Sequence, residues 1–374
     1  METHEDLLSD AEAAERADHG GTLRLTAATG ARIRRAAALR EFEPEADRAL
    51  SALGADGRPR ALVILGYGTG ATVARLISAI AGAAAAVPIV QVPGPALPGW
   101  VGPLDLVLVA STAGRAPEIS AALAEAGRRG SRIVVVAPSA SPIGQLCEQV
   151  RGTLIPMADD TAPVWTRLWS VAIPALMVAE VAGILQPQSY EAAASAADEA
   201  AMRFRPSQEP FVNPAKEIAL RFGECTPSVW AAGQVAAVAA ERLGDQAALR
   251  AGLPVTHAAL PALGSGLLGL LDGPLASAAG DIFRDPFEDG AAAGAAVIVL
   301  AEQGADPRLD VVESLVRDRG LPLTVVTAEQ TDPLARAAYL VALADFAAAY
   351  LAVFVGAGPD QGRTVEEFRL RTAQ

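Results

Sequence analysis

The sequence is poor in the residues that build metal centres and disulfide frameworks. It has two cysteines and three histidines in 374 residues. Neither Cys147 nor Cys225 has a second cysteine or a histidine at metal-ligand spacing. We therefore expect reduced, buried thiols in a cytoplasmic protein, with no metal site. No nucleotide-binding fingerprint is found either, so we expect no cofactor.

Positive charge and unbroken apolar segments are also scarce. The chain has 30 Lys and Arg against 43 Asp and Glu, a net charge of −13. Such an acidic surface argues against nucleic acid and against an anionic membrane as partners. The first twenty residues are acidic and do not resemble a signal peptide. The apolar tracts near 171–185 and 336–357 are interrupted by proline or charged residues, which favours buried helices over membrane spans.

Aromatic residues make up only 5% of the chain, although 51% of it is hydrophobic. Most of that share is alanine, so we expect large cores built from small side chains. Continuous apolar runs that end in small residues alternate with helical patterns, which is typical of parallel β-sheets in an α/β fold. The expected strands are 61–68, 87–92, 105–112, 132–139, 227–233, 295–303 and 321–329.

The pattern of strands and helices occurs twice. Each half ends in a long apolar helix, at 163–185 and at 334–356. This approximate duplication predicts two flavodoxin-like halves, each with a ligand site at the carboxyl ends of its strands. We expect the following division of the chain: an N-terminal helical segment 1–54, a first domain 55–186, a helical linker 187–212 and a second domain 213–374.

Two loops in the first half could hold an anion. A glycine loop at 65–72 lies between a buried strand and a helix, where backbone N–H groups and the helix dipole attract negative charge. Ser111 and Thr112 end another strand of the same predicted sheet. The simpler alternative is a tight turn between strand and helix, followed by a helix cap.

Four segments occur in the order and spacing of known motifs. They are Gly66-Tyr67-Gly68-Thr69-Gly70, the loop 111–118, Asn213-Pro214-Ala215-Lys216 and Leu260-Pro261-Ala262-Leu263-Gly264-Ser265-Gly266-Leu267. In these motifs the chain resembles tandem sugar-isomerase (SIS) domain proteins, most closely the bifunctional phosphoglucose/phosphomannose isomerases. The resemblance implies two tandem SIS domains, a hexose phosphate ligand, and a homodimer whose active site is completed by the second chain.

The chain departs from this family where the chemistry is expected. In the family a glutamate carries the proton between C1 and C2 of the sugar, and a histidine opens the ring. The corresponding positions here hold Leu249 and Ser265, neither of which can do this work. A positioned acid or base typically contributes about 10²–10⁴-fold, so most of the acceleration should be lost. His257 lies eight residues before Ser265 and is not an obvious substitute.

Other acidic and basic residues could take part. Asp245, Glu241 and Asp281 are candidates for a relocated base, although no spacing argument selects among them. Arg369 stands near the family's C-terminal lysine and could contact a phosphate, but arginine stays charged and is no equivalent proton donor. Glu118 is better explained as a carboxylate that favours a helix start.

The resemblance places the phosphate on Gly68, Thr69, Gly70, Ser111 and Thr112. Gly70 stands where the family has a serine, although Thr69 beside it supplies a hydroxyl. Val164 replaces an expected arginine, and Arg167 could face the same site. Arg115 replaces an asparagine and has two possible roles: filling the pocket or adding positive charge to it.

Three hypotheses follow from these residues. The chain could be an active hexose-6-phosphate isomerase with a rearranged site. It could be a phosphosugar-binding protein that retains the fold with little or no isomerase activity, which the residue chemistry favours. It could also be a scaffold whose pocket has no ligand. Turnover separates the first two hypotheses, and stabilisation by hexose phosphates separates the last two.

Overall fold

The computed structural model describes residues 4–157, 162–277, 294–304, 306–358 and 360–372. The chain forms two compact units, each built from segments distant in sequence. The first-half unit comprises Thr29–Ser195 and Glu367–Gln374, and the second-half unit comprises Met1–Ala28 and Ala196–Glu366. The four sequence-ordered domains expected above stay a prediction.

The first-half unit contains a five-stranded parallel sheet with strand order β2-β1-β3-β4-β5. The strands are β1 (Leu62–Leu65), β2 (Ile89–Val92), β3 (Leu106–Ala110), β4 (Arg132–Ala137) and β5 (Thr153–Pro156). The first four lie within predicted strands. The sequence analysis missed β5, which is a short edge strand ending in proline.

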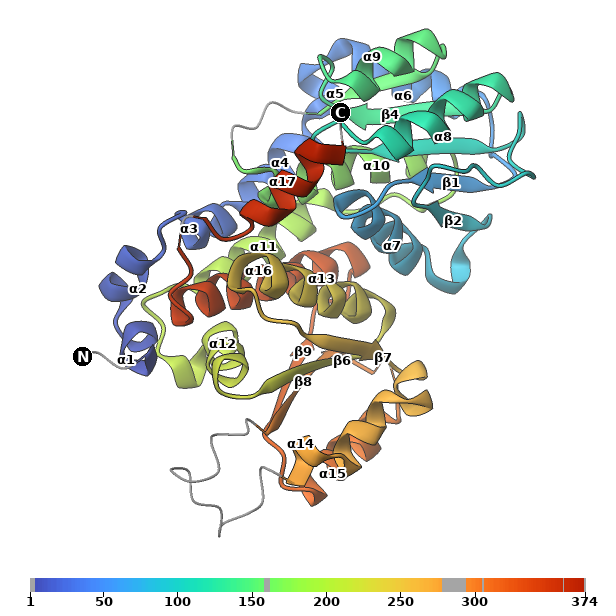
Figure 1. The fold of residues 1–374 in the computed structure, drawn as a ribbon. Coiled ribbons are helices and arrows are strands. Elements are labelled where there is room, and N and C mark those ends of the chain that lie inside the picture. The colour runs from blue at the N-terminus through green and yellow to red at the C-terminus, as the bar shows by residue number, and fades with distance from the viewer. Residues whose placement is uncertain (1–3, 158–161, 278–293, 305, 359, 373–374) are drawn as a thin grey trace. The chain divides into compact units, whose positions relative to one another are not determined.

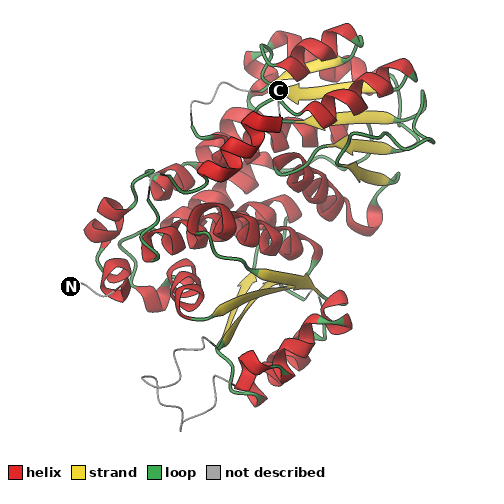
Figure 2. Ribbon diagram, in the orientation of Figure 1, coloured by secondary structure: helices red, strands yellow, loops and turns green. Residues whose placement is uncertain are grey.

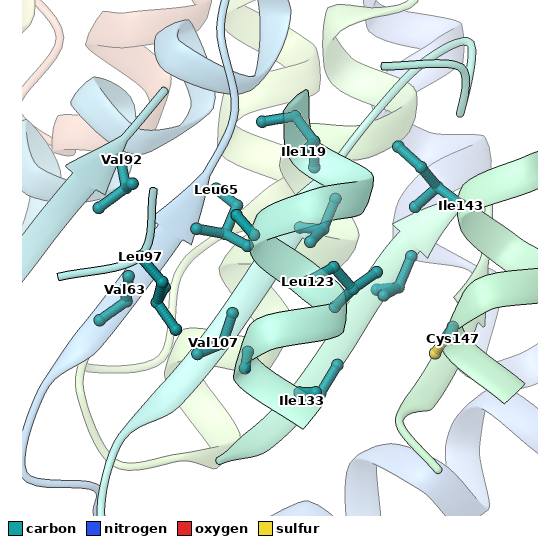
Figure 3. Close-up of a cluster of buried hydrophobic side chains, with 14 of the residues drawn as sticks. Val63, Leu65, Val92, Leu97, Val107, Ile119, Leu123, Ile133, Ile143 and Cys147 are labelled. Atoms are coloured by element: carbon teal, nitrogen blue, oxygen red, sulfur yellow. The ribbon is translucent and has the colours of Figure 1, made fainter. Parts of the chain in front are cut away.

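The sheet of this unit lies between layers of helices (Figure 1), and alternate residues along a strand face opposite layers. Val63 and Val107 point to one face, where they join a buried cluster with residues of α8 and α9 (Figure 3). Val135 belongs to the same cluster. The helices of the unit are α4 (Thr29–Ala37), α5 (Leu39–Phe42), α6 (Pro44–Ala55), α7 (Thr69–Ala81), α8 (Pro117–Arg128), α9 (Pro142–Gln149) and α10 (Leu168–Val181). Because both faces are covered, β1 and β3 are buried along their whole length.

The second-half unit contains a four-stranded parallel sheet with strand order β7-β6-β8-β9. Its strands are β6 (Thr226–Ala232), β7 (Thr256–Ala259), β8 (Ala295–Glu302) and β9 (Leu323–Ala328). Strand β7 was not predicted, because its Thr-His-Ala-Ala sequence is exposed or half-buried at a sheet edge and carries no apolar run. The order matches β2-β1-β3-β4 of the first sheet, so β6 corresponds to β1 and β8 to β3.

Helices cover the second sheet on two sides (Figures 1 and 2). Helices α12, α13 and α16 lie on one side, and α14 and α15 lie on the other. The bounds are α1 (His4–Ser9), α2 (Ala11–Ala17), α3 (Thr22–Ala27), α12 (Pro214–Glu224), α13 (Gln234–Ala251), α14 (Pro274–Ser277), α15 (Leu309–Asp318) and α16 (Pro333–Phe354). Two further helices, α11 (Tyr190–Arg203) and α17 (Arg363–Thr372), each have residues in both units.

Helix α16 is the central core element of the second-half unit. By length and composition it could cross a membrane, but 94% of its most apolar stretch is buried in the protein. It is therefore a core helix, as predicted. It carries Asp345, whose carboxylate accepts hydrogen bonds from Arg242 of α13 at 2.8 and 2.9 Å. Both residues are less than 10% exposed, so the ion pair lies between the two helices.

Candidate functional site

The glycine loop between β1 and α7 is held by close backbone packing. A Cβ atom at Gly66 would lie 2.8 Å from the Cα of Gly70, and one at Gly70 would lie 2.9 Å from the carbonyl oxygen of Ala110. Gly68 adopts a positive φ of 54° just before α7 begins. The serine that the family has in place of Gly70 would not fit here, so the packing explains the glycine.

The second loop follows β3 and is closed by its own serine. The N–H of Ser111 donates to Val136 at 2.9 Å, and its Oγ accepts from the N–H of Gly114 at 2.9 Å. Thr112 beside it is 5% exposed. Ser111 therefore has a fixed position at the strand end, and its hydroxyl hydrogen remains able to donate to a ligand.

The structure brings the two loops to one edge of the first sheet. Strands β1 and β3 are neighbours, with Leu65 paired to Val109, and Gly70 lies directly against the end of β3. The predicted phosphate-binding residues Gly68, Thr69, Gly70, Ser111 and Thr112 therefore share one edge. We call them the first strand-end site. The backbone N–H groups of the glycine loop were expected to face an anion. The N–H of Gly70 instead donates to the Tyr67 carbonyl oxygen at 3.1 Å.

Tyr67 extends from the glycine loop and meets charged groups of two other segments. Its hydroxyl donates to Oε2 of Glu118, in the first turn of α8, at 3.5 Å. Burial and the Glu118 carboxylate raise the pKa of Tyr67, and the nearby positive charge of Arg369 opposes this. Sequence reasoning missed Tyr67. The only available signal was a single large side chain within a glycine-rich loop.

The Asn213-Pro214-Ala215-Lys216 motif has a structural role. Asn213 caps α12, accepting from the N–H groups of Ala215 at 3.1 Å and Lys216 at 3.3 Å. Lys216 is the only lysine in the chain and is completely buried. Its Nζ donates to the carbonyl oxygens of Leu8 and Pro206, both at 2.6 Å, and of Gln208 at 2.8 Å. It joins α1 to the start of α12.

The stability of the protein should depend on pH through Lys216. Burial lowers the pKa of Lys216 to about 8 from an ordinary value of 10.5. Between these values the unfolded chain binds more protons than the folded one, so the free energy of unfolding contributed by this group rises with pH. We expect the wild type to gain stability relative to Lys216→Met from pH 7.5 to 9.5, measured by urea unfolding. A difference that stays constant or shrinks would contradict this pKa.

Comparisons with known proteins agree with this architecture. Residues 211–371 match the family described as the bacterial phospho-glucose isomerase C-terminal SIS domain. Tagatose-6-phosphate ketose/aldose isomerase from Escherichia coli superposes with a TM-score of 0.63 at 15% identity, over 92% of this chain and 97% of that one. The chain has the tandem SIS fold.

A second solved structure supports the same SIS fold. The C-terminal domain of glucosamine-fructose-6-phosphate aminotransferase from Francisella tularensis superposes with a TM-score of 0.60 at 13% identity, over 91% of this chain and 97% of that one. A comparison with curated protein sequences finds no match. Identities this low establish the fold, and the ligand must be argued from the residues.

The expected SIS catalytic positions lie at opposite edges of the second sheet. Leu249 is in the last turn of α13, which leads back to the start of β7 at Thr256. Its side chain packs within 3.2 Å of a Cβ atom placed at Gly362. Ser265 lies beyond the other end of β7, in an exposed 3₁₀ helix (Ala262–Ser265). The two positions therefore lie beyond opposite ends of β7.

One candidate base, Asp245, lies one helical turn before Leu249 on α13. Glu241 and Asp245 lie one helical turn apart on α13, half-buried and exposed respectively. Asp281 lies outside the described residues. Glu118 alone adjoins the first strand-end site, through Tyr67. Of the two described candidates on α13, Asp245 is therefore the one beside the position of Leu249.

The remaining predicted contacts have mixed outcomes. The Nε of Arg167 donates to the carbonyl oxygen of Ala162 at 2.6 Å, which ties this side chain to its own loop. Arg115 is exposed rather than buried in a pocket. His257 is exposed on β7. Among the described residues, no three His, Cys, Asp or Glu side chains are grouped as a metal ion would require.

Proposed function

We propose that this SIS-fold chain binds a hexose phosphate at the first strand-end site and has little or no aldose–ketose isomerase activity. The observation that carries this proposal is the junction of two loops at one sheet edge, with Gly70 against the end of β3. Backbone N–H groups at the start of α7 and hydroxyls of Thr69, Ser111 and Thr112 suit a phosphate. We also propose a cytoplasmic homodimer.

The proposal of weak or absent catalysis rests on residue chemistry. Leu249 cannot accept a proton and Ser265 cannot replace an imidazole as an acid at neutral pH. The second candidate is an active isomerase with a rearranged site. One observation favours it: Tyr67, Glu118 and Arg369 place titratable and charged groups beside the same two loops.

Ligand-induced stabilisation tests the binding proposal. Fructose 6-phosphate at 100 times its dissociation constant should add about 2.7 kcal/mol to the free energy of unfolding. Ser111→Asp should abolish this gain, because a second anion at the strand end repels the phosphate. The matched control is Ser78→Asp, at an exposed position near the C-terminal end of α7 and so away from the strand end, which should retain the gain. Stabilisation that survives in Ser111→Asp would place the ligand elsewhere.

Tyr67→Phe should separate recognition of the sugar from recognition of the phosphate. The change removes one hydroxyl and leaves both loops intact. We expect fructose 6-phosphate to bind about fivefold more weakly, as the loss of about 1 kcal/mol of hydrogen bonding predicts. Inorganic phosphate should bind as it does to the wild type. Calorimetric titration measures both, and equal losses for the two ligands would show that Tyr67 acts only through the loop.

A further inference from the structure

The second sheet has a position equivalent to the first strand-end site, where β8 ends at Glu302 and α13 begins at Gln234. We call it the second strand-end site. Strand β6 pairs with β8, as β1 pairs with β3, and Ala232 faces Ala301 where the first sheet pairs Leu65 with Val109. Helix α13 begins directly after β6, as α7 begins after β1. In this register Glu302, the last residue of β8, corresponds to Ala110, the last residue of β3 and the one before Ser111.

Glu302 is buried and fully engaged at the start of α13. Its Oε1 accepts from the N–H groups of Val235 at 2.7 Å and Ala236 at 3.1 Å. Its Oε2 accepts from Arg336 of α16 at 2.6 Å. Glu302 is 8% exposed. Any side chain at Gly233 would collide with this carboxylate.

These partners are the ones that a bound anion would use. Two N–H groups of a helix's first turn and one guanidinium are a common arrangement around phosphates and carboxylates. We infer that Glu302 is an internal anion that occupies the second strand-end site, so that this half takes no phosphorylated ligand. The inference depends on the second-half geometry alone and does not need the first-half proposal to be right.

Within the described residues of the first half, no side chain caps the start of α7. Three residues, Gly66-Tyr67-Gly68, separate β1 from α7, whereas Gly233 alone separates β6 from α13. Gly68 supplies no side-chain cap to α7. Ala110, which corresponds to Glu302 in the strand register, carries no charge. The two halves therefore differ at their strand ends. The first strand-end site suits an external anion, whereas the Glu302 carboxylate occupies the second strand-end site.

Binding of inorganic phosphate tests this inference. In Ser111→Asp, which disables the first strand-end site, calorimetry should detect no phosphate binding. In Ser111→Asp/Glu302→Ser, the freed N–H groups and Arg336 should bind one phosphate per chain. The single variant Glu302→Gln fills the same space and still accepts hydrogen bonds, so it should gain no site. Wild-type binding, measured separately, reports on the first-half proposal alone.

Two outcomes would overturn the inference. One is phosphate binding by Ser111→Asp that disappears when Arg336→Leu is added, because the second end would then be open. The other is a folded Ser111→Asp/Glu302→Ser variant, checked by circular dichroism, that binds no phosphate. If that variant does not fold without phosphate, recovery of its folded spectrum on addition of phosphate supports the inference, and failure to recover contradicts it.

Discussion

Lys216→Met is expected to lower the free energy of unfolding by about 3 kcal/mol or more, since each buried acceptor left without its donor costs about 1–3 kcal/mol. The Nζ of Lys216 serves three carbonyl oxygens, those of Leu8, Pro206 and Gln208. Methionine fills a similar volume but donates no hydrogen bond. Urea unfolding followed by circular dichroism measures the loss.

The control for this prediction lies on the same helix. Glu224 is exposed in the last turn of α12, and Glu224→Met should change stability by no more than about 0.5 kcal/mol. A loss below about 1 kcal/mol in Lys216→Met would contradict the structural role. Because Lys216 is the only lysine, an amine reagent should label it only after unfolding, which mass spectrometry detects.

Arg242→Met is expected to cost about 3–5 kcal/mol, the usual effect of leaving one charge of a buried pair without its partner. Asp345 accepts two hydrogen bonds from Arg242, and both residues lie within the α13–α16 contact. This pair joins α16 to the helix that carries Leu249. Thermal and urea unfolding both measure the effect.

A double variant separates the buried charge from simple loss of packing. Arg242→Met/Asp345→Leu removes both charges of the pair and also takes the Asp345 charge from buried Arg250. It should therefore recover about half of the stability lost in Arg242→Met. Asp245→Ala, at an exposed position of the same helix, is the control for helix substitutions. A double variant as unstable as the single one would mean that the loss comes from packing rather than from the unpaired carboxylate.

The sequence predicted the central strands and the edge strands β2 and β9, and it missed the edge strands β5 and β7. Strands β1, β3, β4 and β8 are buried on both faces, so their apolar runs are continuous and easy to identify. Strands β5 and β7 pair on one side only and are partly exposed. Their formation depends on neighbouring strands, which no local pattern records. The N-terminal helices are divided between the two units. This division also depends on contacts between distant residues, so no local pattern predicts it.

The candidate site was predicted as a position but not as a set of contacts. Loop order in a parallel sheet placed Ser111 beside the glycine loop, because neighbouring strands end at one edge. The contact of Tyr67 with Glu118 joins residues 51 apart and has no sequence signature. The motif around Lys216 matched its family without change, yet only the structure shows that its lysine is buried. Glu302 was missed because a strand-end glutamate resembles any solvent-exposed carboxylate.

One measurement tests the central claim most directly. Pure protein is incubated with fructose 6-phosphate while NMR follows glucose 6-phosphate and mannose 6-phosphate, with Ser111→Asp as the control for contaminating isomerase. We predict no product above that control, together with broadening of the fructose 6-phosphate signals by the wild type alone. Turnover that disappears in Ser111→Asp would contradict the account, because it would require a working base despite Leu249 and Ser265.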